Sequence, residues 1–189
     1  LLTSLINEKH DKQLVGQVGE VKALQTLKDF IQSHLAEYDT QRDLPFLDAT
    51  SHLSRYLRTG EIAIRTIYQA VINEPESEGQ QTFIKELAWR DYYNMIYAMN
   101  PQQNTQSLRP EFQKIAWRNN HNDFLLWQTG QTGFPIVDAA MRQLNQTGWM
   151  HNRLRMIVAS FLTKDLLIDW RWGEQYFHDQ LLDYDPASN

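Results

Sequence analysis

The chain has 189 residues, a net charge of −5 at pH 7 and a 42% share of hydrophobic residues. That share suffices for a buried core and excludes wholesale disorder. The absence of cysteine excludes disulfides, thiolate metal sites and cysteine nucleophiles, and no apolar run reaches the roughly 20 residues of a membrane span.

The hydrophobic pattern is helical along most of the chain, because apolar residues recur at intervals of three and four. Six helices are expected in this way, over residues 19–35, 61–73, 82–99, 135–146, 150–168 and 173–182. Pro135 suits a first helical turn, where its missing N–H costs nothing, and Gly148 should break the same helix. No segment alternates apolar and polar residues as a strand would, so the predicted fold is all-α with several helices.

Short polar stretches separate these helices, at residues 38–51, 75–79 and 100–110. Residues 1–18 are polar and only weakly periodic, which predicts a linker. Residues 19–189 are then expected to form one helical domain.

Charge is unevenly distributed towards the end of the chain. Residues 141–171 carry five arginines and lysines against two acids, whereas residues 172–189 carry only acids. A local basic face can bind phosphates on an acidic protein, because salt screens distant charges. A solvated helix face is the ordinary alternative, and charge alone favours it.

Glu86, Trp89 and Arg90 share one helix face, because they are spaced at i, i+3 and i+4. A surface Glu–Arg pair above a core tryptophan explains this spacing. The functional interpretation is a pocket wall with a stacking surface, an acceptor and a phosphate-binding cation. The spacing by itself favours the first explanation.

A second helix face combines Trp149, Asn152, Arg153 and Met156, at i, i+3, i+4 and i+7. An amide and a guanidinium are unusual on a core-facing stripe, because both need polar partners when buried. An aromatic ring, a thioether and an amide together suit a flat heteroaromatic ligand. Spacing leaves a core stripe and a ligand wall equally open.

Two loops carry further polar groups. Residues 50–54 present three hydroxyls at a loop-to-helix junction, which suits either an anion site or ordinary helix capping, the commoner case. Asp183 and Asp185 stand two residues apart before Pro186, where they could bind a cation, accept N–H bonds from a ligand or form a solvated turn. The six histidines show no metal spacing, and no Walker loop or GxGxxG motif occurs.

The stretch from Gly133 to Asn189, with TGWMHNRLRM and DYDPASN, closely resembles the FAD-binding domain of DNA photolyases and cryptochromes. The similarity runs from about Gly19 to the last residue. It implies an all-α, multi-helix FAD-binding domain of that type, with FAD as cofactor. Because that domain continues beyond the position of Asn189 in the family, we expect a C-terminally truncated domain that binds FAD poorly by itself. Residues 1–18 would be a remnant of an interdomain linker, and an antenna chromophore would bind a missing N-terminal domain.

The resemblance assigns FAD contacts residue by residue. FAD would be held by Tyr38, Thr50, Ser51, Leu53 through its backbone, Ser54, Arg90, Trp149, Arg155, Asp183, Asp185 and Asn189. Arg155 and Asp183 would pair beside the isoalloxazine, and Asn189 would lie near its N5 atom.

The resemblance also assigns a lesion site. The pocket for a flipped cyclobutane dimer would be lined by Glu86, Trp89, Trp149, Asn152 and Met156. The expected catalytic residues are Glu86, Trp89, Asn152, Met156 and Asn189. Trp89, Trp149, Asn152 and Arg153 would contact DNA. Trp117 and Trp170 resemble two members of the tryptophan chain that reduces the flavin under light.

The subtype follows from a few positions. Photolyases acting on (6-4) products, and animal cryptochromes, carry histidine in place of Asn152 and Met156. Plant cryptochromes usually have aspartate in place of Asn152 and Asn189. The chain therefore resembles class I cyclobutane pyrimidine dimer photolyases of bacterial type, with Phe83 replacing a common tryptophan.

The expected function is light-driven repair of UV-damaged DNA by electron transfer from reduced FAD, in the bacterial cytosol, with no membrane and no obligate protein partner. One alternative is a flavin-based blue-light sensor that signals through a partner protein. The bare sequence also allows a helical interaction module with no cofactor, which a colourless purified protein would indicate.

Overall fold

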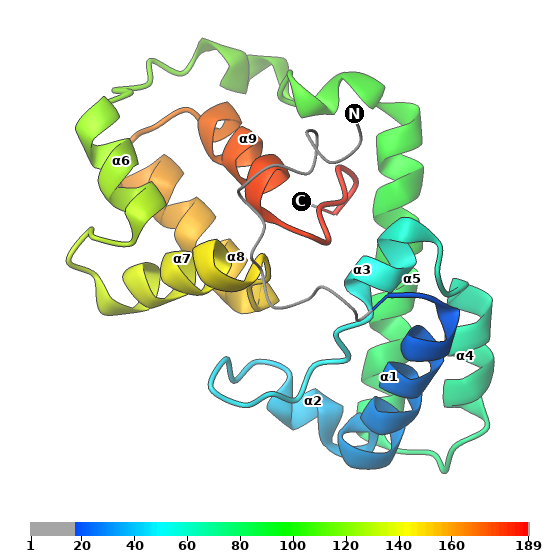
Figure 1. Ribbon diagram of the computed structural model, residues 1–189. Coiled ribbons are helices and arrows are strands. Elements are labelled where there is room, and N and C mark those ends of the chain that lie inside the picture. Colours follow the sequence, from blue (N-terminus) through cyan, green and yellow to red (C-terminus); the bar gives the residue numbers. More distant parts are fainter. Residues whose placement is uncertain (1–17, 189) are drawn as a thin grey trace, which may run out of the picture.

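The computed structural model describes residues 18–188, and within that range it contains helices and loops but no strand (Figure 1). The all-α prediction is confirmed. The α-helices there are α1 (Glu20–Ser33), α2 (Tyr38–Gln41), α3 (Ser54–Thr59), α4 (Ile64–Ile72), α5 (Glu78–Met99), α6 (His121–Thr129), α7 (Pro135–Thr147), α8 (Asn152–Ser160) and α9 (Trp170–Gln180). The predicted linker at 1–18 and Asn189 lie outside the described residues, except for Val18.

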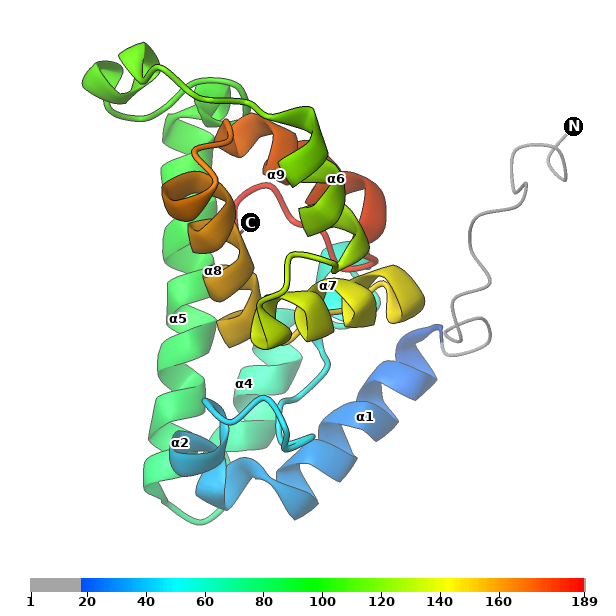
Figure 2. The ribbon, with the colours of Figure 1, turned by 90° about the vertical axis from the view of Figure 1, so that its left-hand side faces the viewer.

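Helix α5 is the longest element and connects two groups of helices. Helices α1–α4 gather around one end of α5, and α6–α9 lie towards its other end (Figures 1 and 2). Each group has its own buried core. Leu27, Phe30, Ile67 and Phe83 belong to the first core, and Trp127, Met141, Leu144 and Leu162 to the second. The space between the two groups is therefore where side chains from both can meet.

Local signals explain where several helices begin and end. The Ser77 side chain accepts the Gln80 N–H at 3.1 Å and caps α5. Pro135 opens α7, and Gly148 ends it at φ 72°, a left-handed conformation that suits glycine. Both predictions for this helix are confirmed.

Other boundaries differ from the prediction. Helix α5 begins at Glu78, four residues earlier than expected, and the expected break at 38–51 opens with the short helix α2. The segment expected over 150–168 begins at Asn152 and ends in a π-helical turn, Phe161–Asp165. Its start is set by His151, whose Nδ1 accepts the Arg153 N–H at 3.1 Å. A side-chain cap of this kind is not visible in hydrophobic periodicity.

Helix α6 was not predicted, because its apolar residues are contiguous rather than periodic. The Asn120 side chain caps it by accepting the N–H groups of Asn122 and Asp123, at 2.9 and 3.1 Å. Trp127 is fully buried and donates its indole N–H to the Val158 carbonyl at 3.0 Å. The buried Trp127 side chain and its hydrogen bond therefore hold α6 against α8.

Candidate functional site

A cavity of about 290 Å³ lies between the two groups of helices. Most of its wall comes from α2, from α5 and from three further segments. These segments are the loop 50–53 before α3, the segment 149–155 and the loop 183–188. Twelve of the sequence-predicted site residues line it: Tyr38, Thr50, Ser51, Leu53, Ser54, Glu86, Arg90, Trp149, Asn152, Arg155, Asp183 and Asp185. Folding therefore brings together residues that are up to 147 positions apart in the sequence (38 to 185).

The centre of the polar wall is the expected ion pair between Arg155 and Asp183. The Arg155 Nη2 donates to both carboxylate oxygens of Asp183, at 3.0 and 2.8 Å, and its Nε donates to the Met150 carbonyl at 2.8 Å. Asp183 is 5% exposed and also accepts the Ser54 hydroxyl at 2.6 Å. Asp183 is thus a buried, fully engaged carboxylate, and the solvated turn considered for it is wrong.

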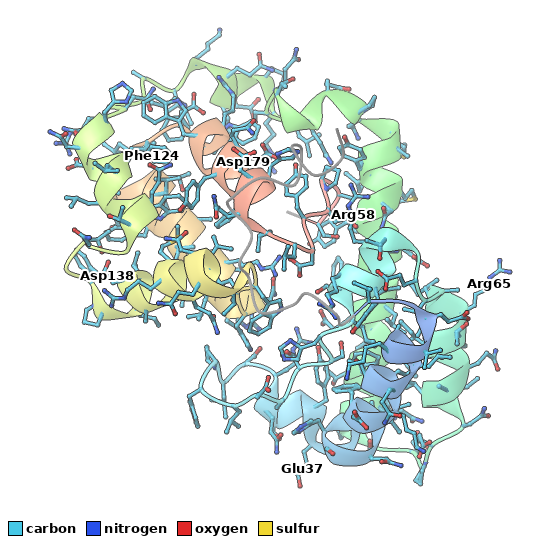
Figure 3. All side chains as sticks on the ribbon, viewed as in Figure 1. Glu37, Arg58, Arg65, Phe124, Asp138 and Asp179 are labelled. Carbon is cyan, nitrogen blue, oxygen red and sulfur yellow. The ribbon has the colours of Figure 1, made fainter. Side chains whose placement is uncertain are left out.

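The second acid of this loop lies beside Arg90. The closest Arg90–Asp185 contact is 3.8 Å, from Nη2 to a carboxylate oxygen, and the other Asp185 oxygen accepts the Ala187 N–H at 3.1 Å. The loop is also tied to α3, because Arg58 donates to the Tyr184 carbonyl at 2.6 Å. Figure 3 shows Arg58 next to the C-terminal loop. These bonds keep both acids at the cavity wall.

Aromatic side chains form part of the same wall. The His52 ring packs on the Trp149 ring with centroids 4.5 Å apart, and His52 has a left-handed backbone at φ 51°. Tyr38 packs edge-on against Phe83 with centroids 5.2 Å apart. Burial raises the pKa of Tyr38 to about 12, so its hydroxyl stays protonated and can donate a hydrogen bond. This wall suits a planar ring system with polar edges.

A chain of ion pairs lies beside the cavity, formed by Glu86, Arg42, Asp43 and Arg153. Arg42 donates to the Glu86 carboxylate, and its Nε lies 3.5 Å from Asp43. Arg153 binds both oxygens of Asp43, at 2.7 and 2.9 Å. We call these four residues the rim ion pairs. The expected Glu86–Arg90 surface pair is wrong, since Glu86 pairs with Arg42.

Some predicted site residues are not in the cavity wall. Trp89 is 50% exposed and stacks on Tyr93 with centroids 5.7 Å apart, so it is not the core tryptophan of the simpler explanation. Met156 is 54% exposed, and its sulfur accepts a long contact of 3.6 Å from Arg153. Both were expected to line the lesion pocket, and the structure places them outside this cavity.

The two tryptophans expected in electron transfer lie elsewhere. Trp117 is partly exposed in the loop before α6. Trp170 lines a second, larger cavity of about 550 Å³ together with Tyr93 and Trp127. The structure does not bring either one into the cavity wall, and Asn189 lies outside the described residues.

Sequence reasoning missed His52 as a wall residue, and Arg42 and Asp43 as rim residues. His52 stood inside the hydroxyl-bearing stretch 50–54, so its neighbours marked the place but not the ring contact. Arg42 and Asp43 fall in a stretch interpreted as a polar break. Adjacent opposite charges there were the only available signal, and such pairs are common on any surface.

Residues 18–188 contain neither a metal-binding cluster nor a membrane-spanning helix. No group of histidines and acids in this range has the geometry to hold a metal ion. In the same range, no helix combines the length and apolarity required to cross a bilayer.

Comparisons with known proteins agree on one family. The sequence profile described as FAD binding domain of DNA photolyase matches residues 83–189. The deoxyribodipyrimidine photo-lyase of Alkalihalophilus pseudofirmus is 49% identical over 91% of this chain and 36% of its own length. That of Escherichia coli is 45% identical over 91% of this chain and 38% of its own length. The chain thus spans little more than a third of these curated relatives.

Solved structures support the same family. A bacterial class III photolyase from Agrobacterium tumefaciens superposes with a TM-score of 0.90 at 43% identity, over 95% of this chain and 38% of the other. A Synechocystis cryptochrome superposes with a TM-score of 0.85 at 36% identity, over 96% of this chain and 39% of the other. The helical arrangement is thus shared with both branches of the family.

Proposed function

The chain belongs to the DNA photolyase family, and from this premise and the cavity geometry we propose that the intact protein repairs cyclobutane pyrimidine dimers in DNA, using light and FAD. The profile match covers 83–189. We extend the FAD-binding domain back to Gly19, because α2 and the loop 50–53 supply one wall of the cavity. The activity is proposed for the intact protein, since the chain covers only part of its relatives.

The observation that carries the proposal is the chemistry of the cavity wall. Thr50, Ser51 and Ser54 bring hydroxyls and Arg90 brings a cation, which are the groups that hold phosphates. The His52 and Trp149 rings, tilted by 39° with centroids 4.5 Å apart, add an aromatic surface to the same wall. These groups fit a dinucleotide with a planar ring system, and we propose that they hold FAD together with Tyr38 and the Leu53 backbone.

The Arg155–Asp183 pair has a separate role in this proposal. A carboxylate that accepts three hydrogen bonds in a 5%-exposed position is fixed in direction. It can therefore accept an N–H from the polar edge of a ring, while Arg155 balances its charge. When bound, reduced FAD would supply the light-driven electron transfer that splits the dimer. The protein residues position the cofactor and the lesion and exclude water.

The lesion would enter from the side of Glu86 and Asn152. A dimer pairs and stacks poorly, so extruding it from the duplex costs less than extruding normal bases. Glu86 and Asn152 line the cavity and can hydrogen-bond base edges. Trp89 and Met156 lie outside the cavity wall, and half-exposed side chains of this kind suit stacking on an incoming base.

The test uses dimer-containing DNA, the intact protein with reduced FAD, and blue light. We expect light-dependent loss of dimers, and Asn152→Asp should slow it, because a second carboxylate in the wall that contains Glu86 would repel the DNA polyanion. Trp170→Phe is the matched control: light-driven reduction of oxidised FAD should slow, while repair by chemically reduced protein continues. Tight FAD binding without any loss of dimers would overturn repair and support the blue-light sensor.

A further inference from the structure

Arg153 is already paired in this structure. Its guanidinium binds Asp43 through two parallel hydrogen bonds, at 2.7 and 2.9 Å, which is the geometry that arginine also uses to grip a phosphate. Hydrogen bonds from Arg153 hold the pKa of Asp43 below its ordinary value, so both partners are charged at neutral pH. The same face of Arg153 cannot bind Asp43 and a DNA phosphate at once.

The second arginine of the rim is occupied in the same way. Arg42 binds Glu86 and also lies 3.5 Å from Asp43. The four residues of the rim ion pairs are two cations and two anions, so their formal net charge is zero. Although Arg42 and Arg153 stand beside the cavity, this face presents little positive charge to a polyanion.

The Asp43–Arg153 pair contributes little to folding by itself. The two side chains are 49% and 39% exposed. Exposed ion pairs typically stabilise a protein only weakly, because water screens them. The bidentate bonds therefore restrain the arginine more than they support the fold, so removing the carboxylate should free the guanidinium and leave the fold intact.

We propose that Asp43 masks Arg153 and thereby limits the affinity of the protein for DNA. This inference rests on the proposed function, in which Arg153 contacts the DNA backbone. Asp43 does not touch the reacting atoms and is a positioning residue for Arg153. In its absence Arg153 gains one phosphate contact, and binding becomes tighter and more sensitive to salt.

The expected effect can be worked out from counterion release. One added phosphate contact steepens the slope of log affinity against log salt by about 0.9, so a fourfold rise in salt costs about 3.5-fold more affinity. Asp43→Asn keeps the size of the side chain and removes its charge. The measurement is the affinity of the intact protein for undamaged and dimer-containing duplexes, between about 50 and 200 mM salt.

Four further variants isolate the mask. Arg153→Gln should weaken binding, and adding Asp43→Asn to it should restore little, because the cation that Asp43 masks is gone. Asp39→Asn makes the same charge change four residues away, and Asp39 forms no ion pair within the described part of the chain. It should leave the salt slope unchanged. Asp43→Ser repeats the test if the asparagine variant folds poorly.

The outcomes separate this inference from the function on which it rests. A steeper salt slope in Asp43→Asn alone supports the mask. An unchanged slope, or an equal rise in the Asp39 variant, overturns it while lesion binding by the unmodified protein still supports repair. Absence of DNA binding by the unmodified protein would overturn the proposed function, and the mask with it.

Discussion

Replacing Asp183 by asparagine removes the charge that faces Arg155 inside the cavity, while the size of the side chain stays the same. The carboxylate accepts two hydrogen bonds from Arg155 and one from Ser54, and its side chain is 3% exposed. Removing one partner of a buried ion pair costs about 3–5 kcal/mol, because the other charge remains in a poorly solvated place.

The lower end of that range applies here. Arg155 keeps its bond to the Met150 carbonyl, and its side chain is 21% exposed, so water relieves part of the penalty. We expect Asp183→Asn to lower the free energy of unfolding by about 3 kcal/mol. With a urea slope of about 2 kcal/mol/M, the unfolding midpoint should fall by about 1.5 M.

Urea unfolding followed by helix circular dichroism measures this effect. Asp185→Asn is the matched control, since its carboxylate only approaches Arg90 at 3.8 Å, and it should cost about 1 kcal/mol or less. Combining Asp183→Asn with Arg155→Met should recover much of the loss, because no unpaired charge is left. A midpoint within experimental error of the unmodified protein, or strictly additive losses in the double variant, would refute the reasoning.

Three further predictions concern other parts of the molecule. Trp89→Ala should weaken binding of the intact protein to dimer-containing DNA by about 1–3 kcal/mol and leave FAD binding unchanged, as competition titrations with each ligand would show. Equal losses of DNA affinity and FAD affinity would mean that Trp89 supports the fold. Burial lowers the pKa of His151 below its ordinary 6.5, although the Arg42 backbone and the Asp43 carboxylate partly oppose this. The unfolded chain therefore binds protons more readily than the folded chain, so the stabilising effect is complete above pH 6.5 and is lost as the pH falls through and below that value. His151→Asn should flatten this pH dependence of the free energy of unfolding, measured by urea titrations at several pH values. An unchanged pH dependence would contradict the prediction. A Cβ at Gly79 would lie 2.1 Å from the Leu35 carbonyl oxygen, so Gly79→Ala should force α5 away and cost about 1–3 kcal/mol in thermal unfolding, whereas an unchanged melting temperature would show that α5 moves freely.

Local patterns in the sequence predicted the helices well where apolar residues are periodic. The segments around α1, α4, α5 and α7 follow this rule. Helix α6 does not, because it is held by one buried tryptophan and an asparagine cap rather than by an apolar stripe. A helix stabilised mainly by tertiary contacts leaves little trace in periodicity.

The candidate site was predicted in most of its membership and in its Arg155–Asp183 pair, but not in its other pairings. The family resemblance named twelve residues that the fold brings to one cavity. It also named Trp89 and Met156, which the structure leaves outside the wall. Whether they meet a ligand depends on a partner that enters from solvent.

The sequence by itself determined the all-α fold and the place of Pro135 and Gly148 in α7. These properties depend on residues that are close in the chain, so they can be read from spacing and composition. Only the tertiary structure decided which charges meet: Glu86 pairs with Arg42 across 44 residues, Arg153 with Asp43 across 110 and Ser54 with Asp183 across 129. Each acid had several arginines of equal chemistry available, and a choice among equal partners is made by the packing that brings two helices together.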